Sequence, residues 1–97
     1  MKPLFEIQAI LRAHADELRE RYGITNLAVF GSVVRGEARE DSDVDLLADV
    51  PENMSLLGII SAENFLSDLV GMKVDFIPRS DIRQELRDHI LDESVAA

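Results

Sequence analysis

The sequence predicts an α/β fold of the α+β type, in which a small mixed β-sheet carries helices mainly on one face. Two observations lead to this prediction. Segments with helical periodicity alternate with short β-like runs, in the order helix, strand, short helix, strand, helix, strand, helix. The 97 residues, 46% of them hydrophobic, suffice for one core, and no repeat or linker divides them. We therefore expect residues 1–97 to form a single domain.

The first two elements are defined by an apolar periodicity and by glycines. A helix is expected over residues 3–22, because Pro3 suits a first helical turn and apolar residues then recur every three or four positions. Gly23 provides its C-terminal stop. A strand is expected over residues 26–30, and it ends at Gly31.

The next elements surround a polar loop. A short helix through residues 33–35 is closed by Gly36, and residues 37–42 are expected to form a loop. The apolar run that follows predicts a strand over residues 44–50, which Pro51 ends.

The last third of the chain predicts a helix, a strand and a helix. Ser55 is expected to cap a helix that ends at Gly71, and a strand over residues 72–77 is stopped by Pro78. Ser80 is a candidate cap for the final helix. The face of that helix is expected to carry three apolar residues spaced four apart: Ile82, Leu86 and Ile90.

Composition excludes several classes of protein. The net charge of −9 argues against a broad electrostatic contact with DNA or RNA, so no standing nucleic-acid partner is expected. The absence of cysteine leaves oxygen ligands or His14 and His89 for any metal, and we interpret both histidines as structural or surface residues. No apolar run could span a membrane and no secretory signal is recognisable, so we expect a cytoplasmic protein.

Three aspartates are placed where they could bind metal together. Residues i and i+2 of a strand point to the same side, so Asp43 and Asp45 present two carboxylates that repel unless a cation joins them. Asp75 interrupts an apolar strand and is expected to be buried beside them, since a buried carboxylate without a partner is costly. Oxygen ligands favour Mg²⁺ or Mn²⁺. We therefore predict that all three are catalytic residues binding two Mg²⁺ ions and a nucleoside triphosphate.

A second group of residues precedes these carboxylates. Gly31 lets the backbone approach a phosphate closely, and Ser32 adds a hydroxyl and a backbone N–H at the start of a short helix, where anions are favoured. Arg35 either neutralises a terminal phosphate or pairs with Glu37 or Asp41 in the acidic loop, and the sequence leaves both open. We predict Gly31, Ser32 and Arg35 as triphosphate-binding residues.

The combination of these features carries the prediction, because each is weak alone. An isolated D-x-D in an acidic chain is mostly solvated surface, and an isolated Gly-Ser pair is mostly an ordinary turn. Here a Gly-Ser turn, a D-x-D strand start and a strand-borne aspartate occur in one short chain. We interpret Asp41 and Asp49, which flank the pair, as solvated.

The segment GSVVRGEAREDSDVDL, residues 31–46, resembles the G-S-x(10)-D-x-D signature of the DNA polymerase beta nucleotidyltransferase superfamily, and the minimal nucleotidyltransferase group in particular. The segment K-V-D, residues 73–75, stands where that family carries its third carboxylate. With the flanking helices, the resemblance covers nearly the whole chain. Val34 departs from it, because the family often has alanine there.

The resemblance implies the nucleotidyltransferase fold, triphosphate binding by Gly31 and Ser32, and metal binding by Asp43, Asp45 and Asp75. It also implies an antitoxin whose partner is a HEPN-domain RNase toxin, which some members silence by transferring AMP from ATP to a tyrosine. A protein adenylyltransferase acting on such a partner is therefore the predicted function, and a homo-oligomer is compatible with it.

Two alternatives remain open. A chain this short could neutralise its partner by binding alone, with a metal site that does not catalyse, although the three aspartates argue against this. Transfer to a small molecule is the other alternative, but relatives with that activity usually carry an extra substrate domain. Variants of the three aspartates that bind the partner yet fail to protect against it would favour catalysis over binding alone.

Overall fold

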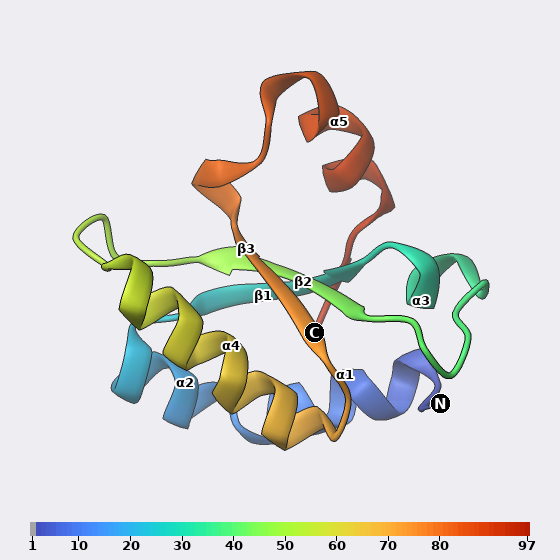
Figure 1. Ribbon diagram of the computed structural model, residues 1–97, viewed down its shortest axis with the longest axis horizontal. Helices are drawn as coiled ribbons and strands as arrows, with labels where there is room; N and C mark the ends of the chain where they lie inside the picture. Colours follow the sequence, from blue (N-terminus) through green and yellow to red (C-terminus); the bar gives the residue numbers. More distant parts are fainter. Residues whose placement is uncertain (1) are drawn as a thin grey trace.

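Residues 2–97, which the computed structural model describes, form a four-stranded mixed sheet and five α-helices (Figure 1). The elements in chain order are α1 (Leu4–Ala13), α2 (Ala15–Tyr22), β1 (Thr25–Phe30), α3 (Ser32–Arg35), β2 (Val44–Asp49), α4 (Leu56–Val70), β3 (Val74–Pro78), a 3₁₀ turn η1 (Arg79–Asp81), α5 (Gln84–Glu93) and β4 (Val95–Ala96). The predicted α/β class with a mixed sheet is confirmed.

The sheet has the strand order β3-β2-β1-β4. β1 runs antiparallel to both β2 and β4, whereas β2 and β3 are parallel and are joined by the crossover helix α4. The register places Asp45 of β2 opposite Phe30 of β1 on one side and opposite Asp75 of β3 on the other. Two of the predicted site residues are therefore neighbours across the sheet.

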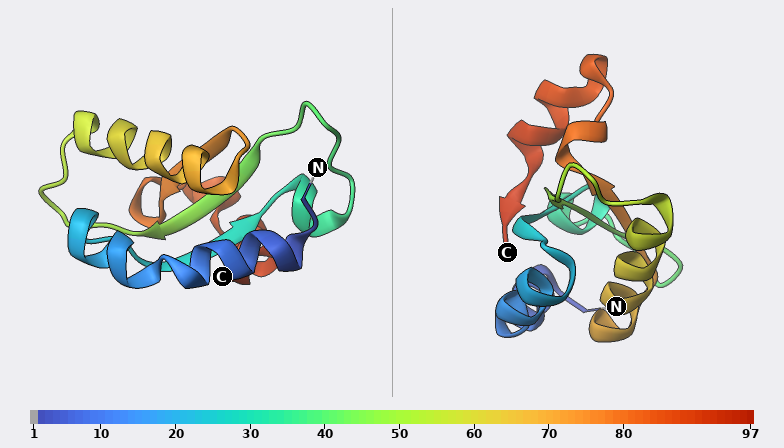
Figure 2. Two further views of the ribbon diagram at one scale, coloured as in Figure 1. Left: turned by 90° about the horizontal axis from the view of Figure 1, so that it is seen from below. Right: turned by 90° about the vertical axis from the view of Figure 1, so that its left-hand side faces the viewer.

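The two faces of the sheet are covered unequally. Helices α1, α2 and α4 pack on one face, whereas α5 stands on the opposite face (Figures 1 and 2). The main core lies on the three-helix side and includes fully buried Leu11, Leu46 and Leu66. Within residues 2–97, the small core on the α5 side contains four buried residues: Ala28, Phe30, Leu47 and Ile82. Since fully burying a large apolar side chain contributes about 1.5–3 kcal/mol, most of the stability comes from the three-helix side.

Several predicted boundaries agree with the structure within one to three residues. The short helix closes at Gly36, which has a positive φ of 73°. The hydroxyl of Ser55 accepts a hydrogen bond from the backbone N–H of Gly58 at 3.1 Å, and it caps α4, which ends at Gly71 as predicted. None of the helices described in residues 2–97 is long and apolar enough to cross a membrane.

The single N-terminal helix predicted over residues 3–22 was wrong, because the chain forms two helices that meet at His14. The backbone N–H of His14 donates to the carbonyl of Leu11 at 3.2 Å, which tightens the turn relative to α-helical spacing. The His14 side chain then contacts Glu17 at 3.2 Å in the first turn of α2. Periodicity alone did not reveal this break, because the apolar positions stay in phase across it.

The predicted start of the last helix was also wrong. Ser80 does not cap it; Ser80 lies in η1, and α5 begins at Gln84. The guanidinium of Arg79 donates to Asp49 at 2.8 Å and so fixes the chain against β2 at the end of β3. Ile82 then enters the small core, so the helix begins only after the chain has left the sheet.

The apolar face predicted for the last helix forms only in part. Ile82 is buried but precedes α5, Ile90 is half-buried, and Leu86 is 46% exposed. The chain then adds β4, which pairs with β1 and was not predicted. A strand of two residues is too short to show a periodicity.

Candidate active site

The strand β2 separates apolar from acidic side chains. Val44 and Leu46 are fully buried in the main core, whereas the intervening Asp45 faces the α5 side with Leu47 of the small core. Asp43 directly precedes the strand and follows the same alternation. The predicted pair of carboxylates on one face is therefore present, and both groups are partly exposed.

Asp75 joins this pair through the strand register. β3 lies beside β2 in parallel, and Asp75 is the residue directly aligned with Asp45, so the two side chains share a face. The prediction that Asp75 is buried was wrong, because it is exposed while its neighbours Val74 and Phe76 are buried. The reason is that β3 is an edge strand whose α5-side face is open at this position.

The ionised form of Asp45 is disfavoured in the folded chain. Burial raises the pKa of Asp45 to about 6, and repulsion from Asp75 and then from Asp43 adds to the shift. Asp43 contacts the ammonium of Lys73 at 3.7 Å, which offsets part of its charge. The charge of Arg35 lowers the pKa of Asp45 but does not offset these effects, so a divalent metal would stabilise the ionised form further.

The donor set fits a hard divalent cation in its chemistry. Three carboxylates from two neighbouring strands interact with one another, and oxygen ligands of this kind suit Mg²⁺ or Mn²⁺. Among residues 2–97, however, no three His, Cys, Asp or Glu side chains converge tightly enough to hold a metal ion. Asp45 and Asp75 are adjacent and Asp43 flanks them, so the carboxylates would have to draw closer around a metal.

The backbone at Gly31 lies against the side chain of Asp45. Gly31 has φ +80° and ψ −153°, a backbone conformation that L-residues with a side chain rarely adopt. It forms the turn between β1 and α3. A Cβ placed on Gly31 would overlap Oδ2 of Asp45. The glycine is therefore required by two independent constraints, and Ser32 follows it as the first residue of α3.

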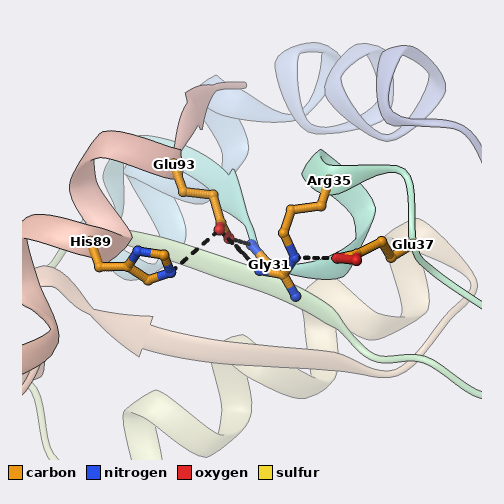
Figure 3. A network of polar contacts seen from close by, with 5 residues as sticks. All are labelled: Gly31, Arg35, Glu37, His89 and Glu93. Atoms are coloured by element: carbon orange, nitrogen blue, oxygen red, sulfur yellow. Dashed lines mark hydrogen bonds and ion pairs between the residues drawn. The ribbon is translucent and has the colours of Figure 1, made fainter.

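Arg35 is held by two carboxylates. Its Nε donates to Glu37 at 2.5 Å. This ion pair is one of the alternatives that the sequence left open for Arg35. Its Nη1 donates to both carboxylate oxygens of Glu93, at 2.9 and 3.0 Å (Figure 3). In this arrangement Arg35 lies next to the Gly31 turn rather than against Asp41.

Sequence reasoning missed Glu93. Its carboxylate accepts a hydrogen bond from the backbone N–H of Gly31 at 2.5 Å and lies 3.7 Å from His89 (Figure 3). Burial pushes the pKa of Glu93 up, but hydrogen bonds from Arg35 and Gly31 outweigh it and hold the pKa below its ordinary value. Glu93 lies 62 residues from Gly31, and among 19 acidic residues no local pattern singles it out.

Comparison with known proteins places the chain in a family of enzymes. Residues 11–97 match the nucleotidyltransferase domain family. The chain is 48% identical over 95 residues to Protein adenylyltransferase MntA of Thermococcus cleftensis, with 98% of this chain and 96% of that protein covered.

Two solved structures share the fold at low identity. One is a toxin–antitoxin crystal structure with AMP-PNP (TM-score 0.75, 14% identity, 92% of this chain and 70% of that chain). The other is a tri-AMPylated Shewanella oneidensis HEPN toxin in complex with MNT antitoxin (TM-score 0.69, 13% identity, 93% and 70%). With the family match over most of its length, the paired carboxylates of β2 and β3 and the Gly-Ser turn above them, this chain belongs to the nucleotidyltransferase domain family of enzymes.

Proposed function

We propose that this chain is a protein adenylyltransferase that transfers AMP from ATP to a tyrosine hydroxyl of a HEPN-domain toxin and so acts as its antitoxin. The observation that carries the proposal is the register that sets Asp45 beside Asp75, under the Gly31 turn, in a chain 48% identical to a protein adenylyltransferase.

The Gly31 turn would bind the triphosphate. Its backbone N–H points to the α5 side of the sheet, where it already meets a carboxylate, and Ser32 adds a hydroxyl beside it. Arg35 is placed one helical turn further on and reaches the same carboxylate as Gly31. These three groups can therefore donate to the oxygens of a phosphate chain that lies above Asp45.

The three aspartates would hold the metal. Asp43, Asp45 and Asp75 supply oxygen ligands on one face, and the ligand chemistry suits two Mg²⁺ ions, or Mn²⁺. When bound, such ions neutralise phosphate charge and lower the pKa of an acceptor hydroxyl. Asp75 is the exposed member, so an approaching hydroxyl would reach it first and could pass its proton to that carboxylate.

The transfer itself exchanges one bond for another. The tyrosine oxygen forms a bond to the α-phosphorus of ATP, and the bond from that phosphorus to the pyrophosphate oxygen breaks, so pyrophosphate leaves. Gly31, Ser32 and Arg35 would hold the leaving phosphates while Asp75 faces the acceptor. An attached AMP adds negative charge and bulk, which would hinder an RNase from binding RNA.

The nature of the partner is supported by charge and by a structural relative. The net charge of −9 favours approach of a basic, RNA-binding protein over approach of RNA. In the Shewanella oneidensis complex of the same fold, an MNT antitoxin is bound to an AMPylated HEPN toxin. A docked partner of this kind would bring its own acceptor residue to Asp75.

The first prediction concerns nucleotide binding. Mg²⁺ together with ATP should raise the melting temperature more than either alone, because the metal relieves the repulsion at Asp45 and the nucleotide completes the coordination. Ligand at 100 times its dissociation constant would add about 2.7 kcal/mol to the free energy of unfolding. The measurement is thermal unfolding with each addition.

Two serine variants test whether Mg²⁺-ATP binds at Ser32. Ser32→Ala should lose most of the Mg²⁺-ATP shift, whereas Ser80→Ala, an exposed serine in η1, should keep it. If both variants keep the full shift, Ser32 does not bind the nucleotide and the proposed triphosphate site is contradicted.

A further inference from the structure

Glu93 makes the contacts that a phosphate group would make. Its carboxylate accepts from the backbone N–H of Gly31 and receives two bonds from Nη1 of Arg35, at 2.9 and 3.0 Å (Figure 3). The Glu93 side chain is 12% exposed, and its bond from Gly31 is part-buried, whereas the Arg35 side chain is 47% exposed. Gly31 and Arg35 are two of the groups assigned above to the triphosphate.

A carboxylate and a phosphate compete for such groups. Both present anionic oxygens to N–H donors and to a guanidinium, and both form charge-assisted hydrogen bonds. Two anions cannot share the same donors without strong repulsion, and Glu93 already acts electrostatically on Asp45. A triphosphate that reaches Gly31 and Arg35 must therefore displace Glu93.

The helix that carries Glu93 is held to the sheet by few apolar contacts of its own. α5 contains no buried residue and meets the small core through half-buried Ile90. Its C-terminal end is tethered by β4, which begins two residues after Glu93 and pairs with β1, so the Glu93 side chain would turn away while β4 stays paired. Ile82, which anchors the segment in the small core, lies before the helix begins. Displacing Glu93 would therefore cost few apolar contacts.

We propose that Glu93 is an internal phosphate mimic: it occupies the Gly31 and Arg35 donors when no nucleotide is bound, and it makes α5 an autoinhibitory strap over the nucleotide site. This inference rests on the proposed function, because it requires the triphosphate to bind at the Gly31 turn. It assigns to α5 a role in controlling nucleotide entry, and it explains why Arg35 and Gly31 share one carboxylate.

The test is a titration of Mg²⁺-ATP at constant pH, with the dissociation constant measured by calorimetry for wild type and three variants. Glu93→Ala should bind Mg²⁺-ATP about tenfold more tightly, since the nucleotide no longer displaces charge-assisted bonds. Glu93→Gln, which keeps an acceptor oxygen but loses the charge, should lie between. Asp92→Asn removes one charge from the adjacent exposed position and should leave the dissociation constant within about twofold.

The outcomes separate this inference from the proposed function. If wild type binds Mg²⁺-ATP but Glu93→Ala and Glu93→Gln bind it no more tightly, the phosphate-mimic proposal is overturned and the nucleotide site stands. Equal gains in Glu93→Gln and Asp92→Asn would overturn it too, since long-range charge would then explain the effect. If none of the four proteins binds Mg²⁺-ATP, the proposed function fails and this inference fails with it. Should Glu93→Ala unfold, the comparison of Glu93→Gln with Asp92→Asn decides.

Discussion

Replacing Asp45 with asparagine is expected to raise the melting temperature at pH 7.5 while reducing nucleotidyl transfer on the order of 10²–10³-fold. The stability gain follows from the pKa of Asp45, which burial and repulsion from Asp75 and Asp43 raise to about 6 from the ordinary 3.8. The loss of transfer follows because an amide is a poor metal ligand. A stabilised but inactive variant is typical of a site where function opposes stability.

The pH dependence has a defined sign. Because folded Asp45 binds its proton more tightly than unfolded Asp45 does, protonation favours the folded state, and this stabilisation is lost as the pH rises from about 4 through about 6. The difference in melting temperature between Asp45→Asn and wild type should therefore be small at pH 4 and grow up to pH 7. Thermal unfolding across this range measures it.

Asp49 on the same strand is the matched control. Hydrogen bonds from Asn26 and Arg79 hold the pKa of Asp49 below its ordinary value, so its ionised form is stabilised by the fold. Asp49→Asn should lower the melting temperature at pH 7.5 and leave transfer intact. If Asp45→Asn also lowers the melting temperature at pH 7.5, the proposed destabilisation by the charge of Asp45 is contradicted.

Gly31→Ala is expected to reduce both stability and nucleotide binding. The substitution places a methyl group against Oδ2 of Asp45 and forces a φ of +80°, and backbone strain of this kind alone costs about 1–3 kcal/mol. Asp45 or the turn must then shift, which moves a metal ligand and a phosphate donor together. Urea unfolding and the Mg²⁺-ATP melting shift measure the two effects.

Gly36→Ala separates the effect of backbone strain from the effect of the close contact between Gly31 and Asp45. Gly36 has a similar φ of +73°, but nothing lies within 4 Å of a Cβ placed there. This variant should lose stability through its backbone alone and keep the Mg²⁺-ATP shift. Equal losses of nucleotide binding in Gly31→Ala and Gly36→Ala would show that the contact with Asp45 is not what requires a glycine at position 31.

The parts of the fold with strong local patterns were predictable. β2 could be placed because an apolar run begins at Val44 and ends at Pro51, and α4 because Ser55 and Gly71 mark its ends. The pairing of Asp45 with Asp75 depends on the parallel register of two strands joined by a helix. Sequence reasoning could anticipate that neighbourhood from the chemistry of the carboxylates, but not the openness of the edge strand that leaves Asp75 exposed.

Features that depend on contacts between distant residues were not predictable. Helix α5 begins late because Arg79 reaches Asp49, 30 residues earlier in the chain, and Ile82 enters the small core. Glu93 reaches Gly31 across 62 residues of sequence, and its position follows from the path of α5 over the sheet. Neither contact has a local signal in residue type or spacing.

The most direct test of the account is the intact mass of a HEPN-domain partner from the same genome after incubation with this chain, ATP and Mg²⁺. We expect the partner to gain one or more AMP units, and Asp43→Asn to abolish the gain, because Asp43 is one of the three carboxylates proposed to hold the metal. Full inhibition of the partner by Asp43→Asn with no change in mass would contradict catalysis and favour neutralisation by binding alone.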